Sequence, residues 1–421
     1  MNHPMKKSFV VFSACLLCLL AIGCNKKGPD APPTLPLATL SPLPTLAPTP
    51  LPTTTPTPSP TQTPVPTPTP SPTPKTVSLL AVGDDLVHGS TLTGGLQKDG
   101  SYDFNGFYTH LKDEISAADI AIINQETILG GSDIPYSGYP RFNTPDSMGD
   151  AIVNAGFDVV LHATNHTMDC GAKAIEHCME YWETNHPEIT VLGIHDSAEA
   201  ENTITVVEKN GMRLAMLNFT YSLNGIKLPS DKMYLVTMLT WENREFIRNQ
   251  IRAAKEVADF VIVFPHWGTE YVYQPDKDQK FWTNLFAEEG VDLVIGAHPH
   301  VLEPVEWITR PDGEKMLVFY SLGNFISGQI EAPRILGGMA EITLTEDENG
   351  KISVTDCCVV PVITHYSETV GDGTYSIYRL SEYTEELAKI HGIHKRAEES
   401  VFTLDGTWEL AREILGEYLK E

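Results

Sequence analysis

Polar side chains with metal-binding chemistry recur in this sequence directly after short apolar runs. The clearest example is DLVIGAHPH, residues 292–300, in which an apolar run of strand length is followed by His298 and His300. Four other apolar runs end in the same way, with the polar residues Asp84, Glu126, Asn165 and His266. Imidazole, carboxylate and amide groups that meet in one pocket suit transition metals such as Mn, Fe or Zn.

Six candidate ligands are too many for one catalytic ion that keeps open coordination positions. Two divalent ions about 3.5–4 Å apart, bridged by a carboxylate, would use all six. A structural zinc site would instead need closely spaced cysteines. The four cysteines beyond residue 24 form no CxxC pair, and we expect buried or partly buried thiols at Cys170, Cys178, Cys357 and Cys358.

The runs that carry these residues predict an α/β domain. Continuous apolar runs are typical of strands covered on both faces. Stretches with one apolar stripe, such as 171–184 and 242–258, separate them and are typical of helices. Because ligands of open α/β sheets bind beyond the carboxyl ends of the strands, we expect the polar residues at these ends to lie together. Farther on, Asn349-Gly350 between alternating runs predicts a hairpin.

The first 75 residues of the chain are predicted to lie outside the folded domain. Residues 1–24 resemble a lipoprotein signal peptide, in which Cys24 would be lipidated; a cleaved secretory signal and an uncleaved anchor are the alternatives. Residues 25–75 are rich in proline and threonine, and proline interrupts helices and sheets. We therefore expect a disordered, extended tether and an extracytoplasmic protein that is lipid-anchored to the cell membrane.

The formal net charge of −26 limits the partners that the protein can have. Nucleic-acid binding needs a basic surface, so we expect no nucleic-acid partner. The same charge repels anionic substrates at long range, and any phosphate chemistry would need cations at the site itself.

Six motifs resemble those of the CapA family of poly-γ-glutamate capsule synthesis proteins, which belongs to the calcineurin-like metallophosphoesterase superfamily. In order along residues 77–330, they are AVGDDL, INQE, TNHTMDCG, PHWGTEY, GAHPHV and YSLGNF. The resemblance implies a metallophosphoesterase-like β sandwich flanked by helices over residues 76–365. Residues 366–421 would follow as a C-terminal helical extension.

The resemblance also implies a role for each candidate ligand. It assigns Asp84 and His300 to one ion, Asn165, His266 and His298 to the other, and Glu126, in place of the usual Asp, to both. His166 would stabilise the transition state or act as general acid, oriented by Asp169. A hydroxide shared by the ions would attack phosphorus.

Two features depart from the family pattern. Thr164 stands where the family commonly has Asn, before the Asn-His pair. The D-x-H opening of ordinary phosphoesterases is missing, but His88 follows Asp84 by four residues and would share its face in a helical turn. His88 is therefore an additional candidate ligand, and the alternative is a polar side chain that lines the pocket.

Three other polar residues have structural interpretations. We expect Asp85 to cap a helix, with a supporting role at the site as the alternative. We expect His162 to be a buried, hydrogen-bonded residue. Asn324 either stabilises a turn or reaches the pocket.

Three functions are compatible with this sequence. The first is a surface-anchored metal-dependent hydrolase of phosphoesters with a role in poly-γ-glutamate capsule synthesis or export. The second is a non-catalytic accessory subunit of a complex that makes an anionic polymer, and the third is a γ-glutamyl amide hydrolase. The expected partners are a phosphoester or poly-γ-glutamate, the membrane through the lipid anchor, and a capsule synthesis complex. Specificity is expected in the loops 91–108, 130–148 and 221–241.

Overall fold

The computed structural model describes residues 74–367, 375–396 and 402–421. Cys24 and nearly all of the predicted tether lie outside these residues. Residues Pro70–Glu421 form one compact unit. Within the described part of the chain, no helix has both the length and the apolar character that a membrane crossing requires.

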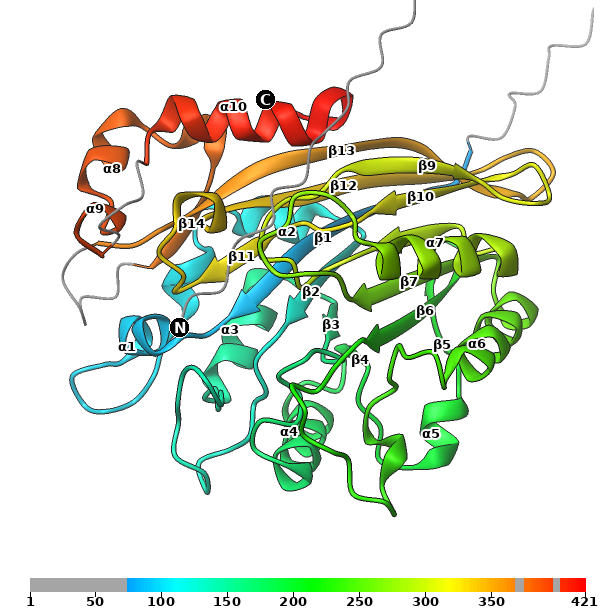
Figure 1. Cartoon of the computed structure of the whole chain (residues 1–421), viewed down its shortest axis with the longest axis horizontal. Coiled ribbons are helices and arrows are strands. Elements are labelled where there is room, and N and C mark those ends of the chain that lie inside the picture. Colours follow the sequence, from blue (N-terminus) through cyan, green and yellow to red (C-terminus); the bar gives the residue numbers. More distant parts are fainter. Residues whose placement is uncertain (1–73, 368–374, 397–401) are drawn as a thin grey trace, which may run out of the picture. The chain divides into compact units, whose positions relative to one another are not determined.

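The unit contains two mixed β-sheets (Figure 1). The first has eight strands in the order β14-β13-β12-β1-β2-β3-β4, with β11 paired to β1. Its strands are β1 (Thr76–Leu86), β2 (Ile120–Gln125), β3 (Val159–Leu161), β4 (Thr190–Leu192), β11 (Asn324–Ser327), β12 (Leu336–Glu346), β13 (Ile352–His365) and β14 (Ser376–Arg379). Strands β1 to β4 run parallel, and β12, β13 and β14 continue the sheet as antiparallel neighbours.

The second sheet has six strands in the order β5-β6-β7-β8-β10-β9. Its strands are β5 (Thr205–Lys209), β6 (Met212–Thr220), β7 (Phe260–His266), β8 (Leu293–Ile295), β9 (Val305–Thr309) and β10 (Lys315–Phe319). The central strands β6, β7, β8 and β10 are parallel to one another. Both edge strands are antiparallel to their neighbours.

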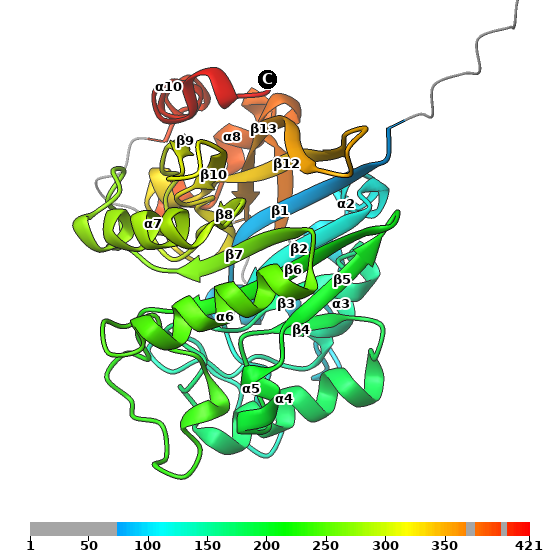
Figure 2. The ribbon, with the colours of Figure 1, turned by 90° about the vertical axis from the view of Figure 1, so that its right-hand side faces the viewer.

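Ten α-helices are present in the described residues. They are α1 (Gly89–Gly95), α2 (Lys112–Ala117), α3 (Ser147–Ala155), α4 (Ala172–Asn185), α5 (Ala198–Asn202), α6 (Arg244–Val257), α7 (Lys277–Glu289), α8 (Glu385–Ile390), α9 (Ile393–Arg396) and α10 (Leu404–Leu415). Figure 2 shows α6 lying across β6 and β7, with α7 beside it. The predicted helices 171–184 and 242–258 correspond to α4 and α6.

The side chains of β7 explain how the layers are held together. Phe260, Ile262 and Phe264 belong to the large core between the two sheets. Val261 and Val263 alternate with them and pack in a second core against α6 and α7. Successive side chains of a strand point to opposite faces, so a continuous apolar run is buried on both sides. The predicted α/β sandwich flanked by helices is thus confirmed.

One local prediction agrees with the structure, and one segment differs in part. A turn at Asp347–Gly350 joins β12 to β13 in the predicted hairpin. The segment 366–421 was expected to be helical, yet it also adds strand β14 to the first sheet, because Ser376–Arg379 pair with β13.

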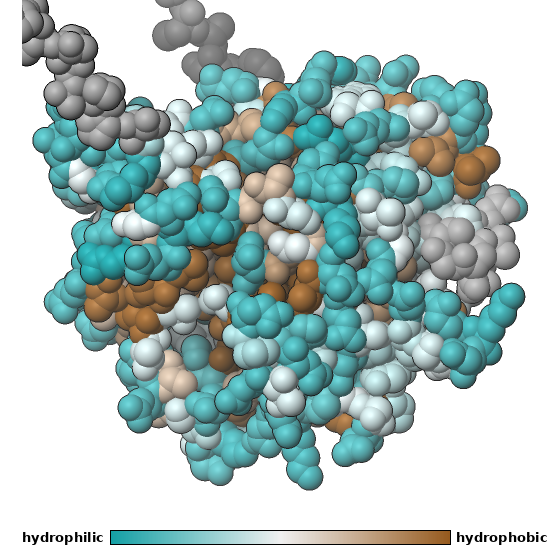
Figure 3. Space-filling model, turned by 180° about the vertical axis from the view of Figure 1, so that it is seen from behind, coloured by the Kyte–Doolittle hydropathy of each residue, from teal (hydrophilic) through white to brown (hydrophobic). Residues whose placement is uncertain are grey.

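The surface of the unit is consistent with its acidic composition. Figure 3 shows that hydrophilic side chains predominate on the face opposite to that of Figure 1, and hydrophobic ones are confined to smaller patches. The cysteines expected as buried or partly buried thiols are all free, and Cys178 is the most deeply buried.

Candidate metal centre

The carboxyl ends of parallel strands from both sheets converge at one edge of the sandwich. In Figure 1 the arrowheads of β1, β2, β6 and β7 point broadly the same way. Asp84 lies near the end of β1, and His266 is the last residue of β7. The other four predicted ligands follow the ends of β2, β3 and β8 and are Glu126, Asn165, His298 and His300. All six are at most 3% exposed.

The structure brings these side chains together in two groups. In the first group, His300 Nδ1 lies 3.0 Å from Asp84 Oδ2, and the backbone N–H of His298 donates to Asp84 Oδ1 at 3.2 Å. In the second group, His266 Nε2 lies 3.0 Å from Asn165 Oδ1. The rings of His266 and His298 are neighbours, with centroids 4.9 Å apart. The expectation that residues from distant parts of the chain meet at one edge is therefore met.

Glu126 lies between the two groups. Its Oε1 is 3.7 Å from His266 Nε2, and its Oε2 is 3.8 Å from His300 Nδ1. Neither oxygen has a hydrogen-bond partner among the described residues, and neither does His298 Nδ1. A buried carboxylate without a partner is strongly destabilising unless a cation compensates for its charge.

These donors fit a metal ion. Glu126, His298 and His300 each offer a ligand atom, and these atoms all lie within 4.8 Å of one another. Carboxylate and imidazole groups are ordinary ligands of divalent transition metals. The unpartnered atoms of Glu126 and His298 point to the same conclusion, so this buried group could hold a metal.

The electrostatics of the protein alone show why a cation is favourable here. Burial, followed by the charges of Asp84 and Glu270, raises the pKa of Glu126 well above its usual value. Burial lowers the pKa values of His266 and His298, and neighbouring imidazoles lower them further. A bound cation reverses this balance, because it stabilises the ionised carboxylate and the neutral imidazoles.

The backbone after β8 is held in an unusual conformation. His298 and His300 have φ values of 101° and 59°, in the left-handed region that costs non-glycine residues roughly 1–3 kcal/mol each. Between them, the carbonyl of Pro299 accepts a hydrogen bond from the N–H of Tyr271 at 2.8 Å. Strain of this kind clusters at functional sites, and here it turns both imidazoles into the site.

A close approach of two backbones positions Asp84. A Cβ at Gly83 would lie 1.9 Å from the carbonyl oxygen of Gly323, so only glycine fits. The N–H of Asp84 donates to that same oxygen at 2.9 Å. Gly83 thus allows β11 to pack against β1 beside the site.

His166 and Asp169 form a pair at the rim of the site. His166 Nδ1 lies 2.7 Å from Asp169 Oδ2, which also accepts a hydrogen bond from the N–H of Phe142 at 2.8 Å. The ring of Phe142 packs edge-on against His166, with centroids 4.6 Å apart. The carboxylate fixes the orientation of the imidazole and leaves Nε2 for proton exchange.

The helical turn expected to join Asp84 and His88 does not form, because β1 continues to Leu86. His88 Nδ1 instead accepts a hydrogen bond from the N–H of Gly328 at 3.2 Å. Its ring packs against Phe142 at 5.3 Å. The condition under which His88 and Asp84 would share a helical face is therefore not met.

Asp85 does not cap a helix, so that prediction is also wrong. It lies within β1, fully buried, and accepts a hydrogen bond from the hydroxyl of Tyr108 at 2.5 Å. Burial raises the pKa of Asp85 to about 7. The backbone carbonyl of Asp85 accepts a hydrogen bond from the N–H of Glu126 at 3.0 Å, so Asp85 helps to position Glu126.

Two asparagines support the site, and Asn124 was not among the predicted site residues. Asn124 Nδ2 donates to Asp84 Oδ1 at 2.8 Å. Its signal was present in INQE, because residues two apart in a strand share a face and Asn124 precedes Glu126 by two. Asn324 Oδ1 lies 3.1 Å from His300 Nδ1, while its Nδ2 donates to the carbonyl of Arg334 at 2.9 Å. Asn324 thus both stabilises a turn and reaches the site.

Two further residues have structural roles. His162 Nε2 accepts a hydrogen bond from Trp182 Nε1 at 2.9 Å, which confirms the structural interpretation of this buried histidine. Thr164, the departure from the family pattern, donates from its hydroxyl to the carbonyl of Glu126 at 2.7 Å. This hydroxyl therefore ties the loop after β3 to Glu126.

Comparison with known proteins identifies the family. Residues 78–329, more than half of the chain, match the sequence model of the bacterial capsule synthesis protein PGA_cap. The chain belongs to this family. It is 29% identical over 208 residues to the PGA biosynthesis protein CapA of Bacillus subtilis (strain 168), covering 47% of this chain and 50% of that protein.

A second relative gives a similar match. The capsule biosynthesis protein CapA of Bacillus anthracis is 30% identical over 184 residues, which is 42% of each chain. The chain thus spans about half the length of the curated relatives it matches, or less. Among solved structures, the NAD nucleotidase (NadN) of Haemophilus influenzae has a TM-score of 0.43 and 11% identity, over 81% of this chain and 67% of that one.

Proposed function

We propose that this PGA_cap family protein is a hydrolase of phosphoesters that uses two divalent metal ions and acts in the synthesis or export of poly-γ-glutamate. One observation carries the proposal. The two oxygens of the buried Glu126 carboxylate face different groups of ligands, one toward His266 and the other toward His300. This is the arrangement that a bridging carboxylate requires.

The surroundings of Glu126 suggest which residues would hold each ion. Asp84 and His300 would hold one, and Asn165, His266 and His298 would hold the other. The short distances within each group, 3.0 Å for Asp84–His300 and 3.0 Å for Asn165–His266, support this division. The mixture of imidazole, carboxylate and amide ligands favours Mn, Fe or Zn.

The side chains around the ions would orient the substrate and move protons. When bound, the ions would supply Lewis-acid stabilisation of negative charge on phosphoryl oxygens. His166 would donate a proton from Nε2 to the leaving oxygen, since Asp169 holds its Nδ1. Phe142 would limit the access of water to this imidazole.

The proposal is tested with the purified protein and Mn²⁺. We expect hydrolysis of an aryl phosphate or an aryl phosphodiester by the wild type. Glu126→Gln and His266→Ala should abolish turnover, while Trp182→Phe, which removes the hydrogen bond to the structural His162, should retain it. A wild-type protein that binds none of Mn²⁺, Fe²⁺ and Zn²⁺ contradicts the proposal.

The family favours a second candidate, a non-catalytic role in assembling the polymer. The relative from Bacillus subtilis is named a PGA biosynthesis protein. In this role the metals would bind polymer carboxylates or stabilise the fold. This role would be supported if the wild type hydrolysed neither phosphoesters nor γ-glutamyl peptides and if variants of Glu126 lost polymer production. Cleavage of γ-glutamyl peptides by the wild type would instead indicate an amide hydrolase.

The predicted lipid anchor extends the proposal to the cell surface. Lipidation of Cys24 and the tether after it would hold the metal centre outside the membrane. Cys24→Ser should release the protein from the membrane fraction into the medium. Equal membrane retention of wild type and variant would contradict lipid anchoring at this residue.

A further inference from the structure

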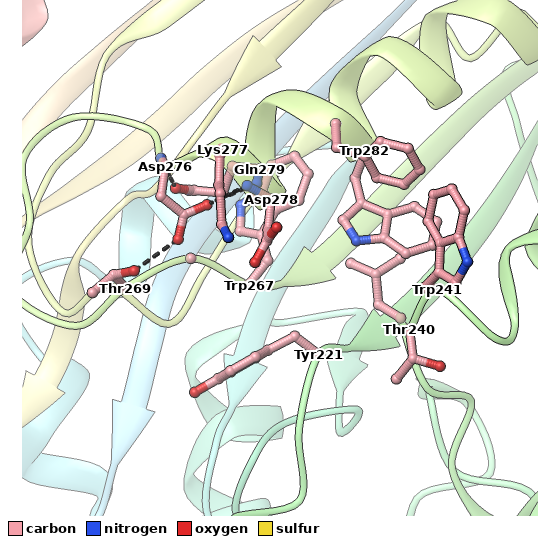
Figure 4. Close-up of a pocket in the computed structure, with 13 residues that line it drawn as sticks. Tyr221, Thr240, Trp241, Trp267, Thr269, Asp276, Lys277, Asp278, Gln279 and Trp282 are labelled. Carbon is pink, nitrogen blue, oxygen red and sulfur yellow. Dashed lines mark hydrogen bonds between the residues drawn. The ribbon is translucent and has the colours of Figure 1, made fainter.

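A cavity of about 600 Å³ lies next to the candidate metal centre. Figure 4 shows its walls: Tyr221 after β6, Trp241 before α6, Trp267 after β7, and Trp282 on α7. Its volume is within the range of about 300–1,000 Å³ that is typical of small-molecule sites.

The cavity shares a wall with the metal centre. The ring of Tyr221 packs against that of His298, with centroids 4.7 Å apart. The N–H of Tyr221 also donates to the carbonyl of His266 at 3.0 Å, and Trp267 is the next residue along the chain. A group held in the cavity is therefore adjacent to any phosphoryl group at the metal centre.

Exposed aromatic rings form one side of the cavity. Trp241 is 58% exposed and Phe281 is 37% exposed, and their centroids lie 5.2 Å apart. The guanidinium of Arg244 stacks on Trp241, with its carbon 4.3 Å from the ring centroid. Exposed rings held in place by neighbouring side chains provide a flat apolar surface on which a ligand can stack.

The polar groups of the cavity argue against a chain of carboxylates as the occupant. Asp276 uses one oxygen to cap α7 and the other to accept from the hydroxyl of Thr269 at 2.7 Å. Lys277 and Asp278 are exposed in the lining and carry opposite charges. At this end of the cavity two carboxylates lie near one ammonium, and this disfavours an anionic chain and favours an uncharged group with hydroxyls or polar edges. The guanidinium of Arg244, at the aromatic side, stacks on Trp241.

We propose that this cavity binds the uncharged ring of a phosphoester whose phosphoryl group lies at the metal centre. The inference rests on the proposed function and assigns a substrate class to it. A sugar ring and an aryl ring both present a flat face with C–H or π character, and either could stack on Trp241 and Phe281. Tyr221, between the cavity and His298, would position the ester bond.

Binding of non-hydrolysable analogues tests the inference without turnover. In the presence of Mn²⁺, we expect phenylphosphonate to bind the protein about tenfold more tightly than methylphosphonate, as measured by calorimetry, in keeping with the strength of ring stacking. Trp241→Ala should remove this preference and leave methylphosphonate binding unchanged. Phe281→Ala serves as a second variant, and Trp307→Ala, an exposed tryptophan on β9, is the matched control.

Hydrolysis assays separate this inference from the proposed function. For each of phenyl phosphate, glucose 1-phosphate and methyl phosphate, the kcat/KM of Trp241→Ala is divided by that of the wild type. A decrease confined to phenyl phosphate or to glucose 1-phosphate identifies the ring. If the wild type hydrolyses all three substrates and the ratio of variant to wild-type kcat/KM is near one for each, the cavity inference is overturned and the proposed function remains intact. Conversely, no turnover together with a phenylphosphonate preference that depends on Trp241 overturns the proposed function and retains a ring-binding cavity.

Discussion

Two buried clusters of histidines differ in how their polar atoms are satisfied. At the edge of the sandwich, His298 Nδ1 and both oxygens of Glu126 have no hydrogen-bond partner among the described residues. Near the C-terminus, His365 Nδ1 lies 2.6 Å from the hydroxyl of Tyr383. In the same C-terminal cluster, His391 Nε2 lies 2.9 Å from the carbonyl of Thr364, and its Nδ1 accepts from a backbone N–H at 3.0 Å.

The difference teaches which buried histidines are available for a ligand. Both clusters are buried and rich in rings, so composition and burial do not distinguish them. The C-terminal cluster has its hydrogen bonds within the protein and stabilises the packing of β13 against the helices after it. The edge cluster leaves two carboxylate oxygens and an imidazole nitrogen close together without hydrogen-bond partners among the described residues, and a cation would satisfy all three.

The largest expected effect is on metal affinity, which should depend on the edge cluster and not on the C-terminal cluster. His298→Ala removes a candidate ligand whose Nδ1 has no hydrogen-bond partner among the described residues, so we expect metal affinity to fall at least about 100-fold, beyond the effect usual for supporting residues. His391→Ala should leave metal affinity unchanged and lower the free energy of unfolding by about 1–3 kcal/mol, because it leaves buried groups unpaired. Calorimetric titration with Zn²⁺ and urea unfolding measure the two quantities.

The opposite result would remove the distinction between the clusters. If His391→Ala lowered metal affinity as much as His298→Ala, the C-terminal cluster would also be part of a metal site. If neither variant changed it, the ion would bind elsewhere.

Metal removal should have the next largest effect, a loss of folding stability that depends on the edge cluster alone. A ligand present at 100 times its Kd stabilises the folded state by about 2.7 kcal/mol. We expect EDTA to remove that increment from the wild type and to leave Glu126→Gln unaffected. Without metal, the variant should be at least as stable as the wild type, because it no longer buries an unpaired carboxyl group.

The sequence predicted the edge cluster well because its signal is local. Each candidate ligand follows an apolar run, and parallel strands bring their carboxyl ends to the same edge. The Gly83-Asp84-Asp85 segment was misread for the opposite reason. Its residue types favour turns and caps, but β1 continues through it because β11, more than 200 residues later, pairs with Asp84–Leu86.

The aromatic cavity shows a second limit of local patterns. Tyr221 and Trp241 are the two ends of the loop 221–241, in which specificity was expected, but Phe281 occurs in a separate segment and resembles an ordinary surface aromatic residue in sequence. Only the arrangement of the loop after β6 against α7 places them around one space beside His298. Strand β14 was unanticipated for the same reason, since its four residues depend on pairing with β13.

Residues that support each cluster should give an intermediate effect. Asn124→Ala removes the hydrogen bond to Asp84, and supporting residues of this kind change metal affinity by about 10–100-fold. Tyr383→Phe removes the hydroxyl beside His365, and we expect a loss of about 1 kcal/mol in stability with no change in metal affinity. An unchanged metal affinity in Asn124→Ala would show that Asp84 is positioned by other contacts.

The smallest effect concerns acid sensitivity of the C-terminal cluster. Burial, and then the charge of His110, lowers the pKa of His365 from 6.5 to about 4. Below about pH 6.5 the unfolded chain binds a proton that the folded protein excludes, so this contribution to stability is lost as the pH falls toward 4. Above pH 6.5 both states are neutral, and no dependence is expected from this residue.

The variant His365→Asn isolates this contribution. Urea unfolding at pH 7.5 and pH 5.0 should show a smaller loss of stability in the variant, by up to about 1.4 kcal/mol per pH unit in the titrating range. Saturating Zn²⁺ should protect the edge histidines from protonation and leave the His365 difference in place, because that imidazole is bound by protein groups alone. If Zn²⁺ abolished this difference between the wild type and His365→Asn, the two clusters would be coupled. The edge cluster, which would bind metal, and the C-terminal cluster, whose hydrogen bonds lie within the protein, would then not be independent.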